Sequence, residues 1–153
     1  MKSVSKAGFE FNKFQIPSFS FNTTDGETEN EERISIQFLP SGSYNIQTGI
    51  FKLYVTFSSQ EEISKKEVIK ANFIAEFRFD ANTDLEQIPS YFYRNALAIA
   101  FPYLRSFIST MSLQAGIKLI ILPILNTSNL EQLLKDNTVI EGDKLEANQL
   151  TKS

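Results

Sequence analysis

The chain has 153 residues and a formal net charge of −3, and 42% of its residues are hydrophobic while 22% are charged. This length is close to that of one ordinary domain and is sufficient to bury a core. The composition is that of a globular protein. The slightly acidic balance argues against a nucleic-acid-binding protein, which would carry an excess of basic residues.

The residue types that are missing restrict the chemistry. Cys, His and Trp are absent from the sequence. Without Cys there is no disulfide, thiolate metal site or cysteine nucleophile, and without His the chain lacks the commonest general base and metal ligand. The sequence also contains no glycine-rich phosphate loop and no nucleophile-elbow motif. It therefore favours a protein that is not an enzyme, and it predicts neither a metal nor a cofactor.

The first half of the chain has the pattern of β-strands. Apolar and polar residues alternate in several segments, at 9–21, 34–38, 51–58 and 68–80. A period of two is typical of half-buried strands. Pro17 marks an edge, a bulge or a break in the first segment, and residues 39–43 interrupt the second. With polar connections at 22–32 and 60–66, we expect an antiparallel meander of about four strands.

The second half is predicted to be helical. Residues 90–100 are rich in helix formers, and the apolar residues that follow have helical spacing as far as Ala115. Because proline loses nothing at the first helical position, we expect a short helical segment to end near Ala100 and the long helix to begin at Pro102. Gly116 fits the position after a helix end.

A short second helix is predicted near the C-terminus. Ser128 and Glu131 fit a capping box, and Asn137 fits the end of the helix. The strand-then-helix order predicts an α+β fold, a four-stranded antiparallel sheet followed by a long and a short helix. We expect a single domain over residues 1–153, with a core at about 9–136 and a polar, frayed tail at 137–153.

The chain start and the apolar runs bear on localisation. The first residues include no apolar stretch of the secretory kind. The longest apolar runs, ALAIAFPYL and LIILPIL, are shorter than the roughly 18 residues that span a bilayer. We therefore expect a cytoplasmic protein that does not insert into membranes.

The segment FPYLRSFISTMSLQAG, followed by LPILN and the short helix LEQLL, resembles the SecB family of export chaperones. The strand FQIPSFSFN is also similar to the family's first strand, and the resemblance spans residues 9–136. The family's long helix starts with an F-P-Y-A-R-like motif, followed by a glycine and an apolar connecting loop with a proline. The positions that carry the resemblance are Phe101, Pro102, Tyr103, Arg105, Gly116, Pro123 and Asn126.

This resemblance implies an ATP-independent holdase, which binds unfolded or precursor polypeptides in apolar grooves. It also implies a homo-oligomer, a dimer of dimers in which long helices lie between sheets. By the resemblance, the peptide-binding residues are Ile34, Ile36, Phe38, Leu119, Ile121, Ile124, Leu130, Leu133 and Leu134. Each of these is equally well explained as core, because an inward strand face and a groove wall have the same pattern.

The same resemblance suggests an oligomer interface on the long helix. Phe107 and Met111 are candidates for that interface or for the core, and Tyr103 accompanies them. Arg105 fits an interface ion pair or the helix surface.

One departure from the family concerns a partner. Export members dock the translocase motor SecA through acidic residues on the first strand, whereas Ser18 and Asn22 are neutral here. SecA is therefore a doubtful partner. The alternative is an adaptor or antitoxin-type chaperone that binds one defined partner.

Overall fold

The computed structural model describes residues 8–22, 34–116, 122 and 127–141. Its elements in chain order are β1 (Glu10–Phe21), β2 (Ile34–Asn45), β3 (Ile50–Glu61), β4 (Glu67–Arg78), η1 (Leu85–Gln87), α1 (Tyr91–Gln114), α2 (Thr127–Asp136) and β5 (Thr138–Ile140). The predicted α+β class and the strand-then-helix order are confirmed.

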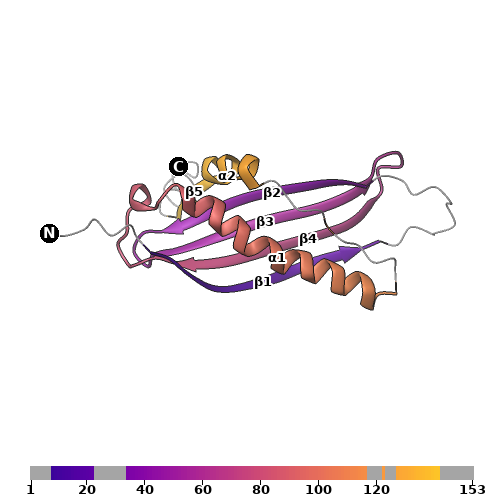
Figure 1. Ribbon diagram of the computed structural model, residues 1–153, viewed down its shortest axis with the longest axis horizontal. Coiled ribbons are helices and arrows are strands. Elements are labelled where there is room, and N and C mark those ends of the chain that lie inside the picture. Colours follow the sequence, from indigo (N-terminus) through magenta and orange to yellow (C-terminus); the bar gives the residue numbers. More distant parts are fainter. Residues whose placement is uncertain (1–7, 23–33, 117–121, 123–126, 142–153) are drawn as a thin grey trace, which may run out of the picture.

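The strands form one sheet in the order β1-β4-β3-β2-β5 (Figure 1). The pairs β1–β4, β4–β3 and β3–β2 are antiparallel, as predicted. The predicted meander is correct only for β2, β3 and β4, because β1 lies beside β4 and not beside β2. The short β5 is an addition to the predicted sheet, and it pairs with β2 in parallel. It lies within the segment that was predicted to be a polar tail.

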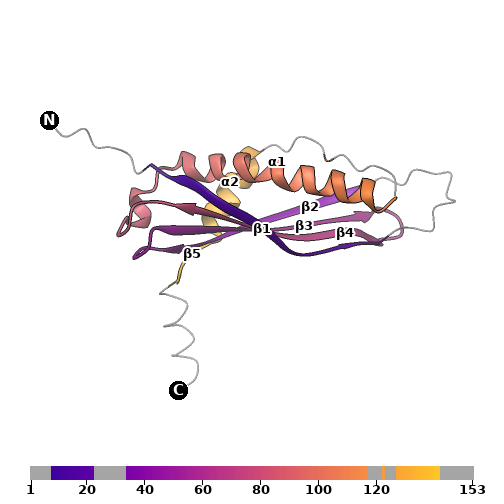
Figure 2. The ribbon, with the colours of Figure 1, turned by 90° about the horizontal axis from the view of Figure 1, so that it is seen from below.

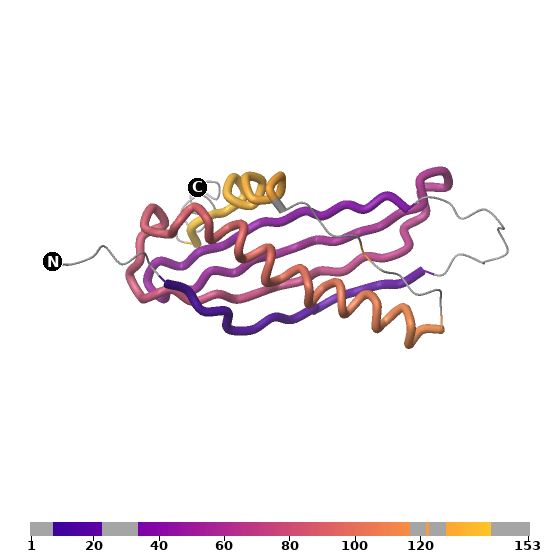
Figure 3. The backbone as a smooth tube through the Cα atoms, in the orientation of Figure 1, coloured from indigo at the N-terminus to yellow at the C-terminus, as the bar shows by residue number. Residues whose placement is uncertain are grey.

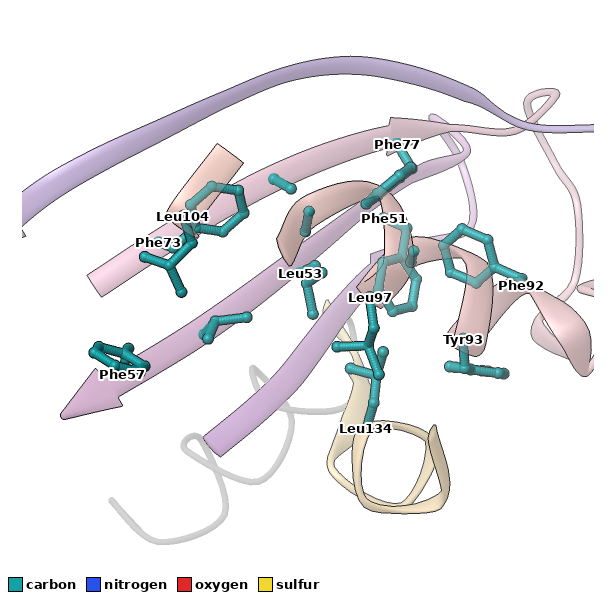
Figure 4. Packing of buried hydrophobic residues seen from close by; sticks show 14 of the residues in the cluster. Phe51, Leu53, Phe57, Phe73, Phe77, Phe92, Tyr93, Leu97, Leu104 and Leu134 are labelled. Atoms are coloured by element: carbon teal, nitrogen blue, oxygen red, sulfur yellow. The ribbon is translucent and has the colours of Figure 1, made fainter. Parts of the chain in front are cut away.

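The core lies between one face of the sheet and α1. Alternate residues of β3 and β4 are buried, and the register places Phe51 opposite Phe77 and Val55 opposite Phe73. α1 runs along this face (Figures 1 and 2) and buries its own apolar residues against it, among them Leu97 and Leu104 (Figure 4). Removing each such side chain from water contributes about 1.5–3 kcal/mol.

β1 shows how Pro17 is accommodated at the edge of a sheet. The strand pairs with β4 on one side only, and its register shifts between Phe11 and Lys13 and again between Gln15 and Ser18. The backbone of β1 bends along its length (Figure 3). Pro17 therefore lies in an irregularity of an edge strand, where the missing N–H is tolerated, and the strand is not broken.

The predicted interruption of β2 at residues 39–43 is wrong, since the strand continues to Asn45. Pro40 lies in the part of β2 that β5 does not reach, so its missing N–H costs no ladder bond there. Gly42 lies where β2 is closest to its neighbours. A Cβ at Gly42 would be 2.5 Å from Phe51 Cζ and 2.7 Å from Thr138 Oγ1.

The predicted helix boundary at Pro102 is also wrong, because α1 continues from Tyr91 to Gln114 with Pro102 inside it. Pro102 is exposed, and so is Ala98, whose carbonyl loses its helical N–H partner. Water can solvate that carbonyl, while buried residues on either side hold the helix on the sheet. The predicted end is confirmed: Gly116, with φ of 71°, follows the C-cap Ala115.

α1 is also long and apolar enough, by length and composition, to cross a membrane. The same property is met by the core helix of a soluble protein. In this structure α1 buries residues along its length against the sheet, from Phe92 to Ser112.

α2 begins at Thr127, so Ser128 lies within its first turn and not at the N-cap position that the capping box requires. Glu131 instead forms an ion pair with Arg94 of α1, with 3.1 Å between Nη2 and Oε2. The predicted end at Asn137 is confirmed, since α2 ends at Asp136.

Candidate peptide-binding surface

The edge of the sheet at β2 is open over most of its length. β5 pairs only with Gly42 to Tyr44, whereas β2 begins at Ile34. Within the described part of the chain, no strand pairs with this edge over residues 34–41. An unpaired strand edge presents backbone donors and acceptors that an extended polypeptide can use.

Apolar side chains accompany this open edge on the helix-covered face. The register places Ile36 opposite Ser59 and Phe38 opposite Phe57, so both share the face that carries the core. Both are half-buried, and the ring of Phe38 contacts Phe101 of α1 edge to face, with 6.1 Å between centroids. Ile34 lies further out and is 44% exposed.

The opposite face of β2 adds an apolar residue that the sequence interpretation did not select. Leu39 is 47% exposed on the polar face of the sheet. Leu39 was not selected because it belongs to the segment LPSGS, which was not expected to be part of a strand.

α2 lies beside β2 (Figure 1), and it contacts both β2 and α1. Leu130 is half-buried against the core, and Leu133 is 36% exposed. Leu134 is 0% exposed and packs inside the core (Figure 4). Leu134 is therefore a core residue and not a groove residue, because it has no surface to offer a peptide.

The remaining predicted groove residues, Leu119, Ile121 and Ile124, lie outside the described residues. The structure therefore places α2 beside β2, with Ile34 at the end of β2 that adjoins the β3–β4 hairpin. We call Ile34, Ile36, Phe38, Leu130 and Leu133 the β2–α2 surface.

A second apolar surface lies where α1 meets β1. Tyr103 is 40% exposed and contacts the rings of Phe11 and Phe14, with centroids 5.4 Å and 4.5 Å away. Phe107 is half-buried and contacts Phe19 edge to face at 5.0 Å. Arg105 and Met111 of the predicted interface are also half-buried.

Phe14 and Phe19, which are 41% and 48% exposed, were not selected from the sequence. A strict period of two from Phe11 places residue 14 on the opposite face. The register shift after Phe11 brings Phe14 back to the helix side. The unusual number of phenylalanines, 14 in all, was the available signal of an exposed aromatic surface.

Ser18 and Asn22, which the resemblance matched to acidic docking positions, take part in hydrogen bonds within the sheet. Asn72 Nδ2 donates to Ser18 Oγ at 2.6 Å. Asn22 Nδ2 donates to the carbonyl of Glu67 at 3.3 Å, and the backbone N–H of Asn22 donates to the carbonyl of Val68 at 2.8 Å. These side chains join β1 to β4 and add no negative charge to the polar face.

Among the described residues, no group of acidic side chains is arranged to hold a metal ion. Burial is the main cause that raises the pKa of Tyr44 and of Tyr93. The hydroxyl of Tyr44 donates to the carbonyl of Thr83 at 2.5 Å, so it holds the loop before η1 against the sheet.

No family model matches the sequence, and no curated protein matches it. Among solved structures, the chain is similar to the SecB-like chaperone Rv1957 of Mycobacterium tuberculosis, which was solved in complex with a ChAD peptide from the Rv1956 HigA1 antitoxin. The TM-score is 0.61 and the identity 11%, over 77% of this chain and 88% of that one. A protein of unknown function from Streptococcus agalactiae covers 77% of this chain and 98% of its own, with a TM-score of 0.44 and 6% identity.

The agreement with Rv1957 extends over most of both chains, and at this level of identity it shows the fold. The antiparallel strands β1 to β4, the long helix and the short helix agree with the architecture that the resemblance implied. The protein has an α+β fold that is SecB-like.

Proposed function

We propose that this protein is an ATP-independent chaperone that binds extended, apolar polypeptide segments at the β2–α2 surface. The observation that carries this proposal is the open edge of β2 between Ile34 and Ser41, with half-exposed apolar side chains beside it. Backbone hydrogen bonds to a strand edge do not depend on the client's sequence, and apolar contacts depend on it only weakly. The proposed client is an unfolded or precursor polypeptide, and the proposed compartment is the cytoplasm.

The similarity to Rv1957 supports a second candidate of the same chemistry. That chaperone was solved with a peptide from an antitoxin. A chain that binds one dedicated partner, such as an antitoxin, would use the same strand edge. The neutral Ser18 and Asn22, which bond within the sheet, favour a role without docking to SecA.

We also propose that the surface formed by α1 and β1 joins copies of this chain into a dimer of dimers. Its exposed aromatic residues, Phe14, Phe19 and Tyr103, would be removed from water at such an interface. The outer edge of β1 is unpaired in the described part of the chain.

The proposal is tested by aggregation of a chemically unfolded model protein, diluted into buffer with and without the chaperone and without ATP. Stoichiometric chaperone should suppress light scattering. Leu133→Arg and Ile34→Arg should each remove most of this suppression, because an arginine cannot be desolvated against an apolar client. Leu113→Arg is the matched control, since Leu113 is 63% exposed near the C-terminal end of α1, which lies on the β1 side of the sheet (Figure 1).

If the wild-type protein suppresses no aggregation, a general holdase is excluded. Affinity isolation from the source cells then separates the two candidates. A single protein that is lost with Leu133→Arg identifies a dedicated-partner chaperone, whereas a mixture of unfolded clients identifies a holdase.

A further inference from the structure

A cleft of about 660 Å³ lies at the end of the sheet where α1 begins, and no residue of the β2–α2 surface lines it. It is bounded by η1, the first turn of α1 and the last turn of α2. Leu85, Ile88 and Pro89 supply much of its apolar lining, and Tyr93 and Lys135 line it as well. Figure 1 shows this end of the molecule opposite the β3–β4 hairpin.

Tyr93 is the unusual residue of this cleft. Tyr93 is only 3% exposed. Its ring packs against the rings of Phe51 and Phe92, with centroids 6.1 Å and 5.6 Å away (Figure 4). Its hydroxyl nevertheless has no hydrogen-bond partner among the residues that the structure describes. The hydroxyl is not among the fully buried polar atoms that lack a partner, so its oxygen is open to the cleft and can bind a group there.

The hydroxyl is in the form that can donate a hydrogen bond. Burial raises the pKa of Tyr93 above the ordinary tyrosine value of 10.0. Tyr93 is therefore neutral near neutral pH and offers an O–H to an acceptor.

The start of α1 also adds partial positive charge to the cleft. The first turn of α1 contains no acidic residue, and its N-cap Ser90 makes no side-chain capping bond. The N–H groups of that turn therefore keep the partial positive charge of a helix start. Lys135 adds an ammonium group and Glu86 a carboxylate, and both side chains lie exposed on the lining. The nearby Arg94 is already paired with Glu131.

We propose that this cleft binds a carboxylate that is attached to an apolar group. The Tyr93 hydroxyl and the Lys135 ammonium donate to the carboxylate, and the start of α1 faces it. Leu85, Ile88 and Pro89 contact the apolar part. The C-terminal residue of a polypeptide has this chemistry, and so does a small organic acid.

The inference is independent of peptide binding at the β2–α2 surface. The test is isothermal titration calorimetry on the full chain with an acetylated Gly-Ser-Gly-Ser-Leu peptide, compared with its C-terminal amide and with N-acetyl-leucine. The free acid should bind about tenfold more tightly than the amide, because hydrogen bonds to a charged group are lost in the amide. Tyr93→Phe and Lys135→Gln should each weaken binding of the acid about tenfold.

Tyr93→Phe should not lower stability to urea, because the hydroxyl that it removes has no partner in the described structure. Lys66→Gln, in the hairpin at the other end of the sheet, is the control and should bind as the wild type does. Tighter binding of the peptide than of N-acetyl-leucine identifies a polypeptide terminus as the ligand, and equal binding identifies a small acid. Equal affinity for acid and amide, or an acid preference that survives both substitutions, overturns the proposal.

Discussion

Leu133 and Leu134 are neighbours in α2, but they lie in different environments. Leu133 is 36% exposed, whereas Leu134 is 0% exposed. The sequence pattern treats both as the inner face of an amphipathic helix, because a stripe of about 100° includes adjacent positions. Only the packing of α2 on β2 decides which of the two reaches the surface.

The two leucines should therefore respond differently to truncation. Leu134→Ala should lower the free energy of unfolding by about 2–5 kcal/mol, because it leaves a cavity in the core. Leu133→Ala should lower it by less than about 1 kcal/mol and should weaken client binding. Urea unfolding at a fixed protein concentration measures both. Equal losses of stability would place Leu133 in the core.

Gly42 allows a close contact that a side chain would block. A Cβ there would be 2.5 Å from Phe51 Cζ and 2.7 Å from Thr138 Oγ1. Gly42→Ala should therefore destabilise the fold by about 1–3 kcal/mol, because Phe51 or β5 must move. Gly8→Ala is the matched control, since nothing lies within 4 Å of a Cβ at Gly8. An unfolding midpoint that Gly42→Ala leaves unchanged would show that β5 shifts without cost.

At the scale of elements, α1 is the clearest case in which tertiary packing overrides a local signal. Pro102 is in the helix interior, where proline is less favourable than alanine by about 3 kcal/mol. The helix persists because residues before and after Pro102, such as Leu97 and Leu104, are buried on the sheet.

Pro102→Ala should raise the free energy of unfolding by about 1–3 kcal/mol, because it restores the N–H that bonds to the carbonyl of Ala98. The prediction separates an interior proline from one at the first helical position, where the same substitution would bring no such gain. Urea unfolding at matched protein concentration is the measurement. A lower free energy of unfolding would indicate that Pro102 is required for the shape of α1.

The strands were predictable where the alternation is regular and uncertain where it is not. Phe51 to Phe57 keep a strict period of two, and β3 follows it. The faces of β1 depend on register shifts that no periodicity records, and this is why Phe14 was missed. β5 has too few residues to show a periodic pattern. It forms because α2 ends beside β2, so that Thr138 lies opposite Gly42.

At the scale of the whole molecule, the described residues form two apolar surfaces outside the core. The resemblance implied both a peptide-binding surface and an oligomer interface. It could not assign side chains to them, because core residues and groove residues have the same periodic pattern in the sequence. The structure keeps Ile34 and Leu133 at the β2–α2 surface and assigns Leu134 to the core. It also adds Phe14 and Phe19 to the surface formed by α1 and β1.

The proposed assembly predicts a tetramer at micromolar protein concentration. A single charged substitution at the interface should dissociate this tetramer. Tyr103→Asp should shift the mass measured by light scattering from a tetramer to a smaller species, because the carboxylate would be buried among aromatic rings without a partner. Leu113→Asp is the control, since Leu113 is 63% exposed near the end of α1. A wild-type monomer at micromolar concentration would contradict the assembly.

The central claim is that a polypeptide client binds along the open edge of β2. Hydrogen–deuterium exchange measured by mass spectrometry tests it directly, on the chaperone with and without an unfolded client. Peptides that cover residues 34–41 should exchange at least about tenfold more slowly when the client is bound, because their amides gain hydrogen-bond partners and lose contact with water. Unchanged exchange over residues 34–41, with protection elsewhere on the chain, would contradict the claim.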